Sequence, residues 1–158
     1  MEFYSAGGLL VHIVCLLILR GDHYLGPIKG HPKEIDDTSL LVTIDGITEA
    51  KGCIQICLVS DEALFLKECT RHDSILISGK APIQYRFENL PAGQYAISLF
   101  QDLNQNQILD KRSFLPIPKE PFGFSNNPPL KFGPPKFSDC LFDLTQANQE
   151  LTIRLRKL

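Results

Sequence analysis

The sequence lacks the charge bias and the short motifs that mark several common functional classes. Its formal net charge is -2, and residues 38–158 hold equal numbers of basic and acidic side chains. A domain without net charge has no general field to attract nucleic acid or a membrane surface, so we do not expect nucleic-acid binding. No CxxC, no Cys/His cluster with zinc spacing and no glycine-rich phosphate loop is present, which argues against a structural zinc site or a nucleotide site.

A hydrophobic run long enough to cross a bilayer is also missing. The apolar stretch "GGLLVHIVCLLIL" (7–19) is shorter than the roughly 20 residues that a spanning helix needs, and its length suits a secretion signal. No Lys or Arg precedes it, and "RGDHYLG" offers no good cleavage site. We interpret residues 1–19 as an export leader, with an uncleaved membrane anchor or a buried element as alternatives. Residues 20–38 read as a linker and residues 39–158 as one domain.

The domain is predicted from a repeated two-residue alternation of apolar and polar side chains, which indicates strands with one buried face. The alternation recurs at 40–44, 54–58, 83–87, 95–99, 140–144 and 151–155. Residues 74–78 suggest a further short strand, and 62–69 fit either a strand or a helical turn. No long helical pattern is present. We therefore predict an all-β fold, an antiparallel Ig-like or transthyretin-like β-sandwich of about seven strands.

One region, residues 112–137, is rich in both proline and phenylalanine. Proline at this density excludes a central strand, whereas Phe114, Phe122, Phe124, Phe132 and Phe137 argue against disorder. We expect a long ordered loop that covers one end or edge of the sandwich, with a ligand- or partner-binding surface as the alternative. Its charge leans positive, so any ligand is expected to be anionic or neutral.

Four cysteines follow the leader, and they allow three complete pairings. On one strand, Cys53 and Cys57 would lie about 13 Å apart. A disulfide requires Cα atoms within about 7 Å, so these two do not pair with each other. A disulfide is expected only if the chain is exported. Otherwise the cysteines are small buried apolar residues.

The stretch "FQDLNQNQILDKRSFLP" (100–116) resembles a calcium loop. Asp102, Asn104 and Asn106 occupy positions 1, 3 and 5, the backbone carbonyl of Ile108 falls at position 7, and Asp110 falls at position 9. Two positions depart from the calcium pattern. Gln107 stands at position 6, where glycine is usual, and Ser113 stands at position 12, where a bidentate glutamate is usual. The sequence predicts a weak, structural Ca2+ site as the only cofactor, with a plain turn of self-bonding Asx side chains as the alternative.

The segments "LPAGQYAISLFQDLNQNQILD", "IPKEPFGFSNN" and "GPPKF" together resemble the bacterial exported-protein family catalogued as domain of unknown function 2141. The resemblance covers about residues 39–158 and is densest over 89–139. Gln107, Pro116 and Pro121 stand where the family pattern has glycine. The resemblance implies a secreted or periplasmic sandwich and supplies no catalytic residue.

The function we expect is therefore that of an exported, non-catalytic module. It would bind a protein partner or an envelope component through the face built by residues 102–137, and would meet the membrane only through its leader. The candidate surface residues are Glu120, Phe122, Phe124, Ser125, Asn126 and Asn127. The alternative is an envelope hydrolase that uses the carboxylates near the loop, Asp102, Asp110 and Glu120. A purely structural role is a third hypothesis.

Overall fold

The computed structural model describes residues 38–115, 117–130 and 133–158. The predicted leader and nearly all of the predicted linker lie outside the described residues, as does Phe132. Within the described part, no helix combines the length and the apolar character that crossing a membrane requires.

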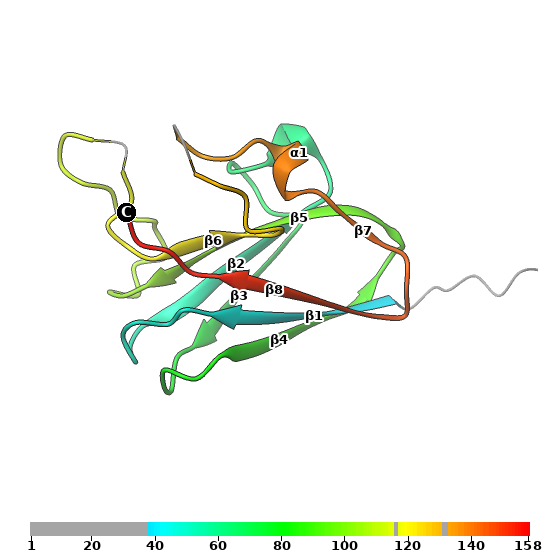
Figure 1. Ribbon diagram of the computed structural model, residues 1–158, viewed down its shortest axis with the longest axis horizontal. Helices are drawn as coiled ribbons and strands as arrows, with labels where there is room; N and C mark the ends of the chain where they lie inside the picture. The colour runs from blue at the N-terminus through cyan, green and yellow to red at the C-terminus, as the bar shows by residue number, and fades with distance from the viewer. Residues whose placement is uncertain (1–37, 116, 131–132) are drawn as a thin grey trace, which may run out of the picture. The chain divides into compact units, whose positions relative to one another are not determined.

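Eight strands form two sheets (Figure 1), which confirms the all-β prediction. The smaller sheet has the order β4–β1–β8, and the larger has the order β3–β2–β5–β6, with β7 also pairing with β5. The strands are β1 Thr38–Asp45, β2 Cys53–Val59, β3 Arg71–Leu76, β4 Ile83–Leu90, β5 Gly93–Asp102, β6 Phe122–Phe124, β7 Phe142–Leu144 and β8 Asn148–Arg154. The helical parts are one 3-10 turn, η1 (Glu62–Leu64), and one α-turn, α1 (Phe137–Cys140).

The main core lies between the inner faces of the two sheets. Leu40, Val42 and Ile44 of β1 are fully buried, as are Ile56 of β2 and Ile97 of β5. Their polar neighbours along each strand face outward. The alternation read from the sequence is therefore the pleat of a two-layer sandwich, with one side of each strand in the core.

One strand relation differs from the predicted antiparallel sandwich. β1 and β8 run parallel, from Ser39 opposite Asn148 to Asp45 opposite Arg154, so the sandwich is not wholly antiparallel. The turn "NLPAGQY" does not form a hairpin, because β4 pairs with β1 and β5 pairs with β2. It is a corner between the sheets, where Asn89 adopts φ +55° and the Tyr95 hydroxyl donates to the carbonyl of Pro91 at 2.9 Å.

A second, smaller core lies on the outer face of the larger sheet. Val59 and Ala96 belong to it, whereas their neighbours Leu58 and Ile97 point into the main core. Phe65, just after η1, packs on it together with the partly buried Phe137 of α1. The ambiguous 62–69 segment is thus a short helical turn, N-capped by Asp61 at 2.8 Å.

Cys140 is a second correction to the strand pattern. It ends the turn of α1 instead of beginning a strand, and β7 starts two residues later at Phe142. Its side chain is fully buried in the second core. Burial raises the pKa of the Cys140 thiol to about 12, which keeps it in the unreactive thiol form.

The proline- and phenylalanine-rich region is only partly the predicted cover. Phe122 and Phe124 are buried in β6, an edge strand that pairs with β5 and forms a bridge from Phe122 to Arg156, two residues past the end of β8. Phe114 contradicts the prediction, because it is 97% exposed. It lies at the end of a loop, where no other element packs on it.

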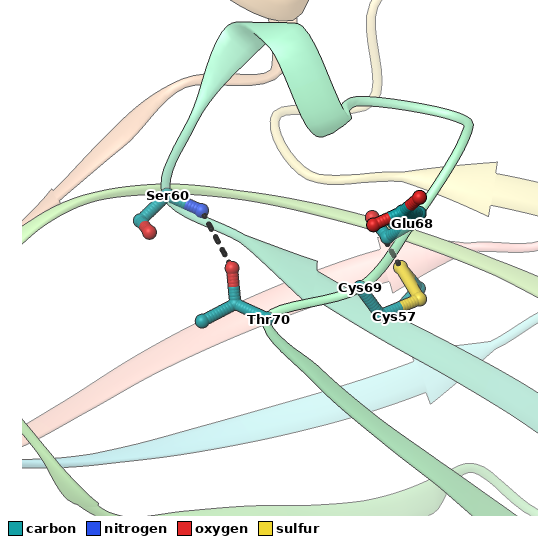
Figure 2. Close-up of a disulfide and its surroundings, with 5 residues drawn as sticks. All are labelled: Cys57, Ser60, Glu68, Cys69 and Thr70. Atoms are coloured by element: carbon teal, nitrogen blue, oxygen red, sulfur yellow. Dashed lines mark hydrogen bonds between the residues drawn. A yellow bond between two sulfur atoms is a disulfide. The ribbon is translucent and has the colours of Figure 1, made fainter.

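A disulfide joins Cys57 of β2 to Cys69, with a Cα–Cα distance of 5.4 Å (Figure 2). Cys53 and Cys140 are free and buried, so Cys53 and Cys57 indeed do not pair. The disulfide closes the connection that carries η1, and Phe65 in that connection packs on the second core. The disulfide therefore attaches the segment that carries Phe65, which covers the second core, to the larger sheet.

Replacing both bonded cysteines, Cys57→Ser with Cys69→Ser, is expected to lower the free energy of unfolding by about 3 kcal/mol. A sequence separation of 12 residues sets this size, because the crosslink restricts the unfolded chain. Urea denaturation measures the loss. The wild type in reducing agent should lose a similar amount, whereas the double variant should not respond to reducing agent. Equal stability of all four samples would contradict the prediction.

Candidate functional site

The candidate calcium loop begins at Asp102, the last residue of β5, whose side chain is fully buried. Its Oδ1 accepts the N–H of Asn106 at 3.1 Å, and its Oδ2 accepts the N–H of Gln107 at 2.7 Å. Gln55 of β2 also donates its Nε2 to Oδ2 at 3.2 Å. Asp102 therefore ties the loop to its own strand and to the neighbouring strand.

The two asparagines of the loop accept N–H groups in the same way. Asn104 Oδ1 accepts from Asn106 at 3.2 Å, and Asn106 Oδ1 accepts from Ile108 at 2.9 Å. Asn104 also donates its Nδ2 to Asp110 Oδ2 at 2.9 Å. The chain coils around these side chains, with the Asp102 and Asn104 oxygens converging on one N–H group. Asn106 Oδ1 bonds a different N–H group, so the three side chains form the succession of self-bonding Asx turns that the sequence offered as the alternative to a calcium site.

Backbone conformation explains why position 6 of such loops is usually glycine. Gln107 has φ +64°, in the left-handed region that glycine adopts freely. A non-glycine residue there costs on the order of 1–2 kcal/mol. The hydrogen bond from the Gln107 N–H to Asp102 helps to offset this cost, so the loop keeps its coil without the usual glycine.

Glu120 closes the loop from outside, a role that the sequence analysis missed. Its side chain is 3% exposed, and its two oxygens accept the N–H groups of Leu103 at 2.8 Å and Asp110 at 3.1 Å. These two residues stand at opposite ends of the loop. The only signal in the sequence was a lone acid between Lys119 and Pro121, placed ten residues after Asp110.

The metal-binding capacity of the loop rests on the five predicted ligands, Asp102, Asn104, Asn106, Ile108 and Asp110. All five lie on the loop, and three of their side chains are already bonded to its N–H groups. In the described part of residues 38–158, the loop included, no group of three or more His, Cys, Asp or Glu is arranged around a point that could hold a metal. Calcium binding therefore stays a prediction.

If the loop binds calcium, 10 mM CaCl2 should raise the free energy of unfolding by about 1.4–2.7 kcal/mol, given a Kd of roughly 10⁻³–10⁻⁴ M. Thermal melting with and without calcium measures this. Asp110→Asn, which keeps the shape of the side chain and removes its charge, should abolish the shift. A wild-type midpoint that calcium does not move would favour the plain turn.

Two of the three carboxylates of the hydrolase hypothesis are buried, and Asp110 is partly buried. Asp102 and Glu120 are buried against N–H donors. Two open hollows on the described surface, of about 490 and 350 Å3, are lined by neither of these residues nor by Asp110. In the described residues, the bonds of Asp102 and Glu120 hold the loop in shape.

Four of the six candidate surface residues are buried: Glu120, Phe122, Phe124 and Ser125. Ser125 accepts the N–H of Ile97 at 2.9 Å and donates to the carbonyl of Cys140, which joins β5 to α1. A buried side chain presents nothing to a partner. These residues serve the interior of the domain.

Asn126 and Asn127 reach the surface, but their amides are bonded to the backbone of other elements. Asn126 donates to the carbonyl of Leu141 at 2.8 Å. Asn127 donates to the carbonyl of Thr152 and accepts the N–H of Arg154, each at 2.8 Å. A further strand on this side of β8 would bond the Thr152 carbonyl and the Arg154 N–H. The Asn127 side chain takes its place and so covers part of the β8 edge.

An exposed hairpin follows the loop and projects from the sheets beside the end of the chain (Figure 1). We define the hairpin by its arms, 110–112 and 117–119, and its tip, 113–115. The arms are joined by the bonds Arg112 N to Ile117 O at 3.0 Å and Lys119 N to Asp110 O at 2.8 Å. At the tip, Phe114 is 97% exposed and Leu115 is 54% exposed. Among the described residues of 102–137, Phe114 is the most exposed large apolar side chain, followed by Ile108 of the loop at 64% and Leu115.

A family model described as "Uncharacterized protein conserved in bacteria (DUF2141)" matches residues 42–152. This chain belongs to the DUF2141 family. No curated protein and no solved structure matches it. The match spans all of the elements described above except the first residues of β1 and the end of β8, so the DUF2141 domain is the β-sandwich itself. It contains both the Asx loop, residues 102–110, and the hairpin.

Removing the Glu120 carboxylate, Glu120→Ala, is expected to destabilise this DUF2141 domain by about 2–3 kcal/mol, because two N–H groups lose a charged acceptor. Urea denaturation measures the change. Glu88→Ala removes an exposed glutamate from β4 and is the matched control, with an expected change within about 0.5 kcal/mol. Equal effects of the two substitutions would show that Glu120 does not hold the loop.

Proposed function

We propose that this chain is an exported, non-catalytic β-sandwich domain that binds a partner or a component of the cell envelope through the exposed part of segment 102–137. The observation that carries this proposal is the hairpin. Its arms are fixed by backbone hydrogen bonds, yet its tip leaves Phe114 97% exposed. A loop that is held by backbone hydrogen bonds and presents a large aromatic side chain to water suits a contact site, because binding residues are often carried on loops positioned by a rigid scaffold.

The rest of the segment supports this reading by contrast. Phe122 and Phe124 are buried, and Phe137 is partly buried. The chain has room to cover phenylalanine in this region and does so at each of these positions. Among these phenylalanines, only Phe114 on the hairpin is almost fully exposed. The binding face that we propose is therefore the hairpin and not the whole segment.

Export is supported by two independent features. The Cys57–Cys69 disulfide fits an oxidising compartment such as the periplasm or the outside of the cell, because cytosolic thiols are kept reduced. The apolar run at 7–19 fits a leader that directs the chain there. An uncleaved leader would anchor the domain at the membrane and leave it in the same compartment.

The non-catalytic part of the proposal rests on the state of the acids. Asp102 and Glu120 accept hydrogen bonds from backbone N–H groups, and Asp110 accepts one from the Asn104 side chain. Each carboxylate has a structural task. The family description adds no activity.

The full-length chain, expressed in a bacterial host, tests this function in cells. We expect it outside the cytoplasm, with Cys57 and Cys69 unreactive toward a maleimide until a reducing agent is added. A photo-crosslinking benzoylphenylalanine placed at position 114 should form an adduct with a protein or lipid of the envelope. The same probe at position 76, where Leu76 is 73% exposed on β3, is the matched control and should not.

Recovery of the chain in the cytoplasm with both thiols reactive would contradict export. Adducts of equal yield at positions 114 and 76 would contradict binding through the hairpin.

A further inference from the structure

We propose that the hairpin tip inserts into an anionic lipid surface, with the flanking basic side chains at the level of the headgroups. This inference rests on the proposed function, since it names the envelope component that the hairpin would bind. It goes beyond the leader, which the sequence analysis treated as the chain's only contact with a membrane.

The tip has the shape that shallow insertion requires. Leu115 donates its N–H to the carbonyl of Arg112 at 3.2 Å, so the chain reverses direction between the two arms. Phe114 and Leu115 stand at this reversal, 97% and 54% exposed. Transfer of these side chains from water into the acyl boundary removes apolar surface from water, which is the driving force of interfacial binding.

The charges around the tip complement anionic headgroups. Lys111 and Arg112 precede the tip, and Lys119 lies on the opposite arm; all three are exposed. Each basic residue close to an anionic membrane surface contributes about a fivefold gain in binding.

The acids of the same region are set back from this surface, since their side chains are buried or partly buried. Asp102 and Glu120 are buried and hydrogen-bonded, and Asp110 is partly buried with its Oδ2 accepting from Asn104. The domain as a whole has no net charge, as the sequence analysis noted. The exposed charge of the hairpin is nevertheless positive, and it is local to the tip.

A bilayer suits this tip better than a folded protein partner does. A stable protein interface buries about 800 Å2 on each side, whereas the tip offers two exposed apolar side chains on a convex turn, with Ile108 of the preceding loop as the next exposed one at 64%. A bilayer surrounds a convex tip on all sides and needs no matching groove. The hairpin is also held at its base, because Arg112 donates to the main-chain oxygen of Leu158 at 2.7 Å.

Co-sedimentation of the purified full-length chain with vesicles tests the inference. The vesicles are phosphatidylcholine with one quarter phosphatidylglycerol, compared with pure phosphatidylcholine. Phe114→Ser with Leu115→Ser should weaken partition at least about tenfold on the mixed vesicles. Leu76→Ser, which removes an exposed leucine from β3, is the matched control and should bind as the wild type does. All of these proteins share residues 1–37, so differences between them report on the hairpin.

The charge contribution is measured separately. Lys111→Gln with Lys119→Gln should weaken partition on the order of twentyfold on mixed vesicles and leave the weaker binding to pure phosphatidylcholine unchanged. Added salt should reduce wild-type binding to mixed vesicles in the same way. Unchanged melting midpoints would show that the variants remain folded.

Equal partition of the wild type and the Phe114→Ser, Leu115→Ser variant would overturn the lipid inference. If the probe at position 114 still formed an adduct with one discrete protein in cells, the proposed function would stand with a protein as the partner. If neither vesicle binding nor the cellular adduct depended on the tip, both proposals would fail.

Discussion

The structure depends on the register of β5 against β2. Seven residue pairs join these strands, from Cys53 opposite Asp102 to Val59 opposite Ala96, and β6 and β7 pair along the other edge of β5. This register places Asp102 at the end of the strand, where Gly52 approaches it. A Cβ at Gly52 would lie 2.0 Å from the Asp102 carbonyl oxygen, so the approach requires glycine. The start of the loop is thus set by the sheet.

Buried carboxylates then hold in place the segment that follows β5, which has little regular secondary structure. Asp102 bonds the inside of the loop, and Glu120 bonds both of its ends. The hairpin begins at Asp110, whose N–H is one of the groups that Glu120 holds. The exposed tip is therefore linked to the sandwich through hydrogen bonds to charged acceptors, which are among the stronger polar contacts in proteins. A tip that inserts between lipids needs such a base, because a floppy loop would lose more entropy on binding.

The sequence predicted the parts of the fold that follow from local pattern, and it failed where distant partners decide. Alternation identified the strands because burial on one face repeats every two residues. It could not show that β1 and β8 run parallel or that β4 and β5 belong to different sheets. The alternation within a strand does not determine which distant strand it pairs with. Cys140 fitted the alternation by coincidence and lies on a helical turn.

The same division applies to the site. The Asx spacing of Asp102, Asn104 and Asn106 allowed either a calcium loop or a turn of self-bonding side chains, and in the structure each of the three accepts a loop N–H. Whether a phenylalanine covers the core or faces water depends on what packs against it, so composition alone treated Phe114 and Phe122 alike. The two side chains differ in exposure because of their positions. Phe122 comes just after Glu120 and begins β6, which pairs with β5, whereas Phe114 lies at a chain reversal where no strand packs on it. One proline-rich segment thus divides into two parts: Phe122 and Phe124 are buried in the domain, and Phe114 faces water at the hairpin tip.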